Sequence, residues 1–197
     1  LFISFVSTDV SENSSWANCF DYFPWEDWRS GRPEVIEEVE VALFNWAQGN
    51  RELRERVEIC FGLGDVGWDA YKVLERYELL YEAQMIPEFW IDIGKPIENQ
   101  ICERLGKPMA FDHRRILATG LSRVRGKLRY RPVVFELIPE TFTLLQLQQV
   151  AEALTGLQLH KQNFRRQIEH SGLVEGTGMN NQNTRGRPAE LFRFRKA

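Results

Sequence analysis

The chain has 197 residues, 43% hydrophobic and 27% charged, with a formal net charge of −3. Its mean hydropathy is −0.38, and it lacks the run of about eighteen apolar residues that a membrane span needs, so we expect a cytoplasmic, globular protein. Its three cysteines are an odd number without a close pair, which argues against a disulfide framework or a zinc site and predicts buried thiols (Cys19, Cys60 and Cys102).

Charge is divided unevenly along the chain. Residues 1–100 carry a net charge of −12, whereas residues 101–197 carry +9. A basic second half suits a module that binds a polyanion, joined to an acidic part with another task.

The first residues read as the interior of a domain. Leu1–Val6 has the apolar density of a buried strand, the chain does not begin with Met, and a secretory signal would need a basic start and a longer apolar core. We therefore expect further sequence upstream.

Residues 16–28 are crowded with aromatic side chains: Trp16, Phe20, Tyr22, Phe23, Trp25 and Trp28. Such rings could stack on an adenine, with Arg29 or Arg32 near a phosphate. Filling a hydrophobic core is the commoner role for such a cluster.

The pattern of apolar residues after this segment predicts several helices. They run from Pro33 to about Gln48, over Asn50–Cys60, from Asp69 to Ile86 with Pro87 ending the helix, over Ile97–Leu105, and from Asp112 to about Lys127. Gly106-Lys107-Pro108 is the best candidate for a linker. Pro132–Ile138 reads as a strand. A basic run lies beside it, which either touches phosphates or balances the acidic half (Arg123, Arg125, Lys127, Arg129 and Arg131).

Two short helices come next. Thr143 is a plausible N-cap for an amphipathic helix that Gly156 ends, and a second helix runs from about His160 to Ser171 before Gly172. Two helices joined by a tight turn containing glycine predict a helix-turn-helix.

The second of these helices has the chemistry of a DNA-recognition helix. Phe164 and Ile168 should face the first helix, whereas Gln162 and Arg166 lie nearly opposite them and Asn163 and Arg165 flank these two. Together with Lys161 at the start of the helix, these side chains are able to pair with bases and phosphates. A merely solvated helix face is the alternative.

A predicted wing favours the DNA-binding interpretation. Leu173–Glu175 and Glu190–Phe194 read as two strands that enclose a loop rich in Gly, Asn and Arg. Arg185 and Arg187 in that loop suit insertion into a narrow minor groove.

These segments resemble the Nudix-related transcriptional regulators of NAD metabolism. The resemblance is carried by Phe111–Leu117, Arg123–Pro132, Phe135–Pro139, Phe142–Leu144, Asn163–Arg166 and Gly186–Ala189, and Phe20–Trp28 is similar to the alphaproteobacterial NAD-repressor branch. It is specific over about residues 108–195. Where the family often has Asp before the recognition helix, this chain has His160, so we expect a weaker N-cap there.

The resemblance implies an α+β, mostly helical protein. Residues 1–107 would be a Nudix-like remnant with helices, serving as sensor or dimerisation region, and residues 108–197 a winged helix-turn-helix domain. It further implies a homodimeric repressor of NAD biosynthesis or salvage genes that binds double-stranded operator DNA and is modulated by a nucleotide effector (ATP, NAD or ADP-ribose). A winged helix that binds RNA or protein is a further alternative.

Enzymatic function is the main alternative. Nudix hydrolysis needs a Gly-x5-Glu-x7-Arg-Glu-x2-Glu-Glu pattern, and this chain has none; an intact pattern could lie only upstream. The acids between residues 34 and 40 lack the Gly and Arg-Glu partners (Glu34, Glu37, Glu38 and Glu40). We therefore predict no catalytic residues and no metal site in this chain.

Overall fold

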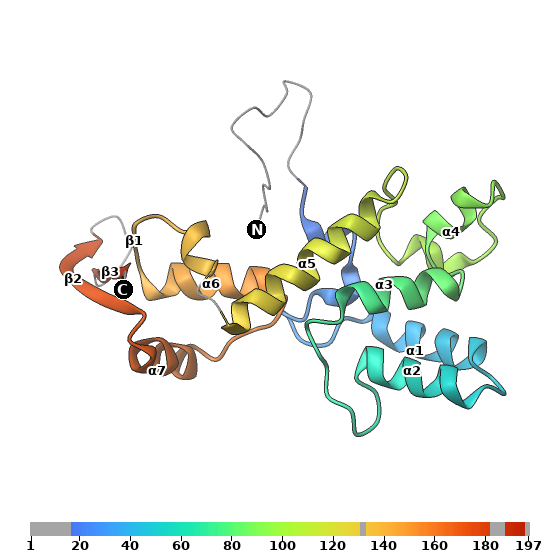
Figure 1. The fold of residues 1–197 in the computed structure, drawn as a ribbon, viewed down its shortest axis with the longest axis horizontal. Coiled ribbons are helices and arrows are strands. Elements are labelled where there is room, and N and C mark those ends of the chain that lie inside the picture. Colours follow the sequence, from blue (N-terminus) through green and yellow to red (C-terminus); the bar gives the residue numbers. More distant parts are fainter. Residues whose placement is uncertain (1–16, 131–132, 182–187, 196–197) are drawn as a thin grey trace. The chain divides into compact units, whose positions relative to one another are not determined.

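Residues 17–130, 133–181 and 188–195 are described by the computed structural model, shown in Figure 1. Their contacts group the chain into two units, Leu1–Arg123 and Val124–Ala197. Each unit has its own hydrophobic core.

The first unit is helical. It contains α1 (Val35–Trp46), α2 (Arg51–Phe61), α3 (Val73–Glu82), α4 (Pro87–Asp92), the first part of α5 (His113–Tyr130), and short 3₁₀ helices at Cys19–Asp21, Pro24–Glu26 and Gln100–Glu103. Local signals explain α2 well: the Asn50 side chain accepts from the amides of Glu52 and Leu53, and Gly62 ends the helix at a φ of +63°. The helices predicted from Pro33, Asn50 and Asp112 are confirmed.

Two predicted helices are shorter than expected. The helix expected over Asp69–Ile86 is α3, which ends where Gln84 takes a left-handed φ of 60°. Pro87 also begins a further helix, α4, because a proline at the first helical position lacks only an N–H that would be unpaired there. The helix expected over Ile97–Leu105 is reduced to the 3₁₀ turn Gln100–Glu103.

The segment expected to be a linker is packed instead. The amide of Lys107 donates to the carbonyl of Asp21 at 2.9 Å. A Cβ on Gly106 would lie 2.8 Å from the carbonyl oxygen of Tyr22. The first unit therefore continues past residue 107 and ends at Arg123. The roles assigned to the two parts stay predictions.

The aromatic segment forms the core of the first unit. Phe23 and Trp25 are fully buried, and their rings meet edge to face with centroids 5.8 Å apart. Arg29 binds Asp27 through two hydrogen bonds of 2.7 Å, and Arg32 pairs with Glu40. Because Phe23 and Trp25 are covered and both arginines are paired, this part of the cluster serves packing rather than adenine stacking.

Two buried ion pairs run through this core. The guanidinium of Arg76 binds the carboxylate of Glu26, with neither side chain exposed, and lies 3.8 Å from the ring centroid of Trp68. Arg114 binds Glu88 at 3.0 Å and also donates to the carbonyls of Tyr22 and Leu105. Such charges are tolerated in a core only when their polar atoms find partners, as they do here.

A Nudix-like sheet is not confirmed in the first unit. Within residues 17–123 the structure contains helices and 3₁₀ turns and no β-strand element. The Nudix-like remnant therefore stays a prediction, while a mostly helical first part is confirmed. The apolar segment Leu1–Val6 lies outside the described residues.

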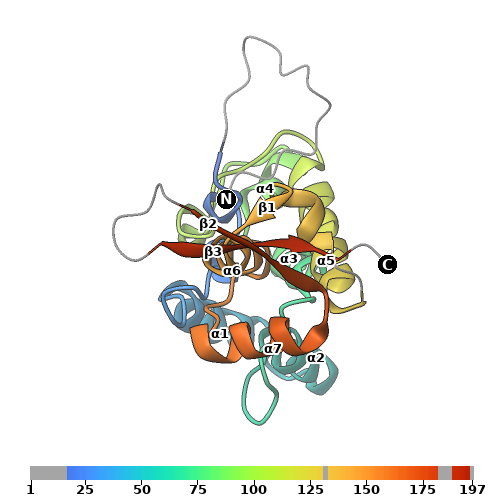
Figure 2. The ribbon, with the colours of Figure 1, turned by 90° about the vertical axis from the view of Figure 1, so that its left-hand side faces the viewer.

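The second unit has the element order of a winged helix. After the end of α5 and a 3₁₀ helix (Val133–Leu137) come β1 (Thr141–Phe142), α6 (Leu144–Thr155), α7 (Lys161–Ser171), β2 (Val174–Asn181) and β3 (Ala189–Phe194). The antiparallel sheet has the order β1-β3-β2, with Phe142 opposite Phe192 and Val174 opposite Phe194. Figure 2 shows β2 and β3 side by side as a twisted hairpin.

The prediction of a strand over Pro132–Ile138 is wrong. Val133–Leu137 is a 3₁₀ helix, and the first strand is the shorter Thr141–Phe142. A short apolar run does not distinguish a strand from a buried helical turn by its periodicity. The helical turn suits Phe135, whose ring stacks on Phe194 with centroids 4.5 Å apart.

Candidate nucleic-acid interface

The helix-turn-helix is set by local capping. The Thr143 hydroxyl accepts from the amide of Gln146, and the Gln146 side chain accepts from the amide of Thr143, a complete capping box for α6. Gly156 ends α6 at a φ of +72°, and Gly172 ends α7 at +66°. His160 precedes α7 without a side-chain capping bond, which confirms the expected weak cap.

One side of α7 is anchored and the other is open. Phe164 and Ile168 are half-buried and pack on a core of four buried side chains (Phe142, Leu144, Leu147 and Val174). The predicted DNA-binding side chains of this helix are all exposed: Lys161, Gln162, Asn163, Arg165 and Arg166. In the part of the chain that the structure describes, none of these five side chains forms an ion pair or hydrogen bond.

The basic side chains of the wing strands differ in this respect. Arg193 binds the carboxylate of Glu175 at 2.6 Å, and Arg195 approaches it at 3.4 Å. The hydrogen bond from Arg193 lowers the pKa of Glu175, so this carboxylate stays ionised at neutral pH. Among the described residues of this unit, the exposed cations of α7 are therefore unpaired, whereas Arg193 and Arg195 are paired with Glu175.

The wing hairpin is longer than predicted. Pairing continues to Asn181 opposite Ala189, with an irregularity between Gly176 and Asn180 where Gly178 takes a φ of +72°. The enclosed loop is correspondingly shorter than the one expected from residue 176 to 188. Arg185 and Arg187 lie outside the described residues.

The basic run at the end of α5 divides into different roles. Arg125 is 1% exposed, and its Nε donates to the carbonyl of Leu154 at 2.9 Å, which ties α5 to the end of α6. Arg123 and Lys127 are exposed. Arg125 is therefore structural, and the side chains of Arg129 and Arg131 lie outside the described part.

Sequence reasoning missed two features of this region. His170 is exposed on the same side of α7 as Arg166, and its Nδ1 lies 2.7 Å from the carbonyl of Arg166. Gln148 and Glu152 on α6 bind the turn before α7. Their spacing of four residues was the available signal, because it places both polar side chains on the same side of the helix.

The cysteine thiols are buried in this structure. All three cysteines are buried thiols outside any disulfide, as predicted. Burial raises the pKa of Cys60, and raises that of Cys102 to about 11, so both are protonated at neutral pH. No group of three His, Cys, Asp or Glu side chains suited to a metal ion occurs among the described residues.

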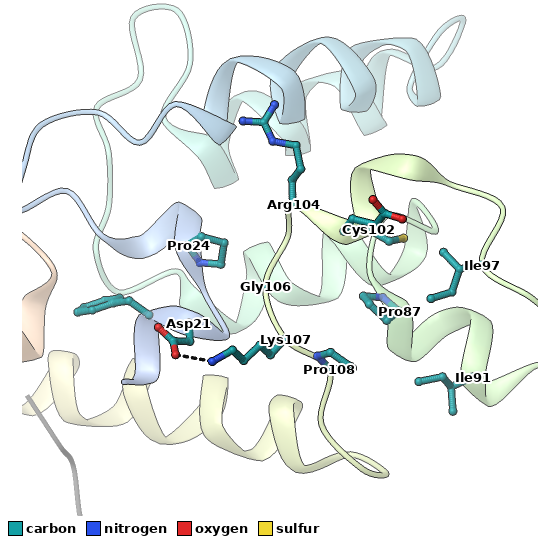
Figure 3. Close-up of a pocket in the computed structure, with 12 residues that line it drawn as sticks. Asp21, Pro24, Pro87, Ile91, Ile97, Cys102, Arg104, Gly106, Lys107 and Pro108 are labelled. Atoms are coloured by element: carbon teal, nitrogen blue, oxygen red, sulfur yellow. Dashed lines mark hydrogen bonds and ion pairs between the residues drawn. The ribbon is translucent and has the colours of Figure 1, made fainter. Parts of the chain in front are cut away.

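A hollow in the first unit is another place where a small molecule could bind. Figure 3 shows its mainly apolar lining, which includes Pro24, Pro87, Ile91 and Ile97. Its two cations are already paired: Lys107 binds Asp21 at 2.8 Å, and Arg104 binds Glu38. The lining therefore offers an apolar surface rather than unpaired charges for a diphosphate.

Comparisons with known proteins agree with the architecture of the second unit. Residues 134–194 match the family model of the NrtR DNA-binding winged helix domain. The ADPR responsive transcriptional repressor NtrR of Acinetobacter baylyi is 40% identical over 86 residues, which are 44% of this chain and 34% of that protein. The carboxyl-terminal part of the chain is thus an NrtR-like winged helix.

Two solved structures of Shewanella oneidensis NrtR are also similar. The complex with a 27mer DNA is 36% identical over 46% of this chain and 41% of that one, with a TM-score of 0.40. A second NrtR structure is 34% identical over 48% and 43%, with a TM-score of 0.39. The chain spans less than half the length of each of these relatives. No helix within the described residues is long and apolar enough to cross a membrane.

Proposed function

We propose that this chain, which carries an NrtR-like winged helix, is a DNA-binding transcriptional repressor. The observation that carries the proposal is the surface of α7, where five polar or basic side chains are exposed and unpaired among the described residues, within a domain that matches a DNA-binding family model. Because the target is operator DNA, the protein would act in the cytoplasm.

The side chains of α7 divide by the chemistry of their partners. Arg166 can pair with the two major-groove acceptors of guanine, and Asn163 or Gln162 with adenine. Lys161 and Arg165 supply positive charge for phosphates. In this proposal Arg185 and Arg187 of the wing loop reach the minor groove.

We further propose that the protein acts as a homodimer. One recognition helix reads only a few base pairs, and useful specificity needs two half-sites about one turn of DNA apart. The acidic, aromatic first unit is the proposed dimerisation region, because its charge would repel DNA.

A nucleotide effector completes the proposal. The Acinetobacter relative is named an ADPR responsive repressor, which supports an effector of the ADP-ribose class. The genes controlled would be those of NAD biosynthesis or salvage, following the resemblance of the sequence. No catalytic activity is proposed, in keeping with the naming of the relative as a repressor.

The experiment is a selection followed by a titration. Duplexes bound by the full chain are selected from a random pool, and affinity is then measured by fluorescence anisotropy for the selected duplex and for a scrambled duplex of the same composition. We expect a clear preference for the selected duplex that Arg166→Ala removes. The matched control is Arg51→Ala, an exposed arginine at the start of α2 in the first unit. An unchanged preference in the Arg166 variant, or equal loss in both variants, would contradict the proposal.

A further inference from the structure

Two side chains of α6 hold the turn that leads into α7. The amide of Leu159 donates to Oε1 of Glu152 at 2.9 Å, and the carbonyl of Leu159 accepts from Nε2 of Gln148 at 2.9 Å. Nε2 of Gln148 also donates to the same Oε1 of Glu152 at 2.9 Å. Gln148 is only 8% exposed. Both main-chain polar groups of one turn residue are thereby bound to α6, and we call these three hydrogen bonds the turn clasp.

The turn clasp acts at the start of α7, where no side-chain capping bond is made. Leu159 lies two residues before the helix begins at Lys161. His160 supplies no side-chain cap, so the first turn of α7 is not fixed by a capping bond. Phe164 and Ile168 anchor the inner side of the helix further along. Apolar contacts limit rotation of α7, while the turn clasp sets where its first turn lies.

We propose that Gln148 and Glu152 are positioning residues for sequence recognition, acting through the turn clasp without touching DNA themselves. This inference rests on the proposed function. Base pairing by Gln162, Asn163 and Arg166 needs their atoms within hydrogen-bond distance of base edges, and such bonds weaken steeply with misalignment. Phosphate contacts by flexible lysines and arginines tolerate a shift of the helix better. Losing the turn clasp should therefore reduce discrimination more than overall affinity.

The chemistry of Glu152 provides a sharp set of variants. Because Oε1 accepts both bonds, Glu152→Gln keeps an acceptor at that position and retains the turn clasp while removing a negative charge. Glu152→Ala removes the same charge and also the turn clasp. Charge alone predicts that both variants bind DNA more tightly, since a carboxylate repels phosphates. If the turn clasp positions α7, affinity for the selected duplex should instead fall in Glu152→Ala and not in Glu152→Gln.

The test uses the full chain with the selected and scrambled duplexes described above. For Gln148→Ala and Glu152→Ala we expect about a tenfold loss of affinity for the selected duplex, comparable with one lost base contact, and a change below about twofold for the scrambled one. Glu152→Gln should bind both duplexes at least as tightly as the unchanged chain. Gln149→Ala, an exposed glutamine on the same helix, is the matched control and should change neither affinity.

Hydrogen exchange of the Leu159 amide reports on the turn clasp without DNA. It should be protected in the unchanged chain and in Glu152→Gln, and exchange faster in Glu152→Ala. Selected-duplex affinities that stay unchanged in the alanine variants, or losses that are equal for both duplexes and follow a lower melting temperature, would overturn the positioning role. If the unchanged chain prefers no duplex at all, the proposed function fails, and the positioning role fails with it even where the Leu159 amide remains protected.

Discussion

The ring of Phe135 stacks on that of Phe194, with centroids 4.5 Å apart and planes inclined by 28°. The ring centroid of Phe135 also lies 5.7 Å from that of Phe142. The 3₁₀ helix Val133–Leu137 therefore packs against β1, which carries Phe142, and β3, which carries Phe194. This contact joins the first half of the second unit to its last strand. It explains why a segment with strand-like composition adopts a helical turn.

We expect Phe135→Ala to destabilise the second unit by roughly 2 kcal/mol, through lost apolar burial and a lost aromatic pair. Thermal unfolding followed by near-ultraviolet circular dichroism would measure the change. Phe135→Leu should recover part of the loss. An alanine variant as stable as the unchanged chain would show that the stacking contributes nothing.

The recognition helix and the wing should respond differently to mutation. Arg166→Ala or Asn163→Ala should cost about 1–3 kcal/mol on the selected duplex and relax specificity. Arg185→Ala and Arg187→Ala should weaken binding to all duplexes and flatten its salt dependence, because they remove charge rather than base contacts. Affinity titrations at several salt concentrations separate the two patterns. Variants that all bind as tightly as the unchanged chain would contradict both assignments.

The buried pair of Arg76 and Glu26 should show strong coupling. Removing one partner leaves a buried charge unpaired, so Arg76→Met or Glu26→Gln should each cost about 3–5 kcal/mol. The double variant should be less destabilised than the sum of the single changes. Urea denaturation of the four proteins completes the cycle. Additive losses would mean that the two side chains stabilise the fold independently.

Dimerisation should accompany specific binding. Two half-sites need two recognition helices, so sedimentation of the protein should show a dimer, and the selected duplex should contain an inverted repeat with about one turn between half-site centres. A monomer that binds a single half-site with nanomolar affinity would be incompatible with this expectation.

The effector should be coupled reciprocally to DNA. An effector changes DNA binding only through its different affinity for the two states, and linkage makes the effect symmetric. We therefore expect ADP-ribose to weaken binding of the selected duplex, and the duplex to weaken binding of ADP-ribose by the same factor. Calorimetry of the protein, with and without the duplex, measures this factor. Equal ADP-ribose affinities would leave the first unit as a dimerisation scaffold only.

Local signals in the sequence were enough for much of the second unit. Thr143, Gly156 and Gly172 specify the ends of α6 and α7 through capping and left-handed backbone conformations, which depend on neighbouring residues alone. The apolar pair Phe164 and Ile168 likewise determines which side of α7 faces inward. The exposed face proposed to bind DNA follows directly from that periodicity.

Only the tertiary structure decided the remaining features, because they depend on contacts between residues far apart in sequence. The helical turn at Val133–Leu137 depends on Phe194, and the packing of Gly106 depends on the carbonyls of Asp21 and Tyr22. The role of Arg125 is the clearest case: a residue in a basic run is buried because the carbonyl of Leu154 offers it a hydrogen bond. Composition cannot separate such an arginine from one that is free for phosphate, since the difference lies in the partner that the fold brings to it.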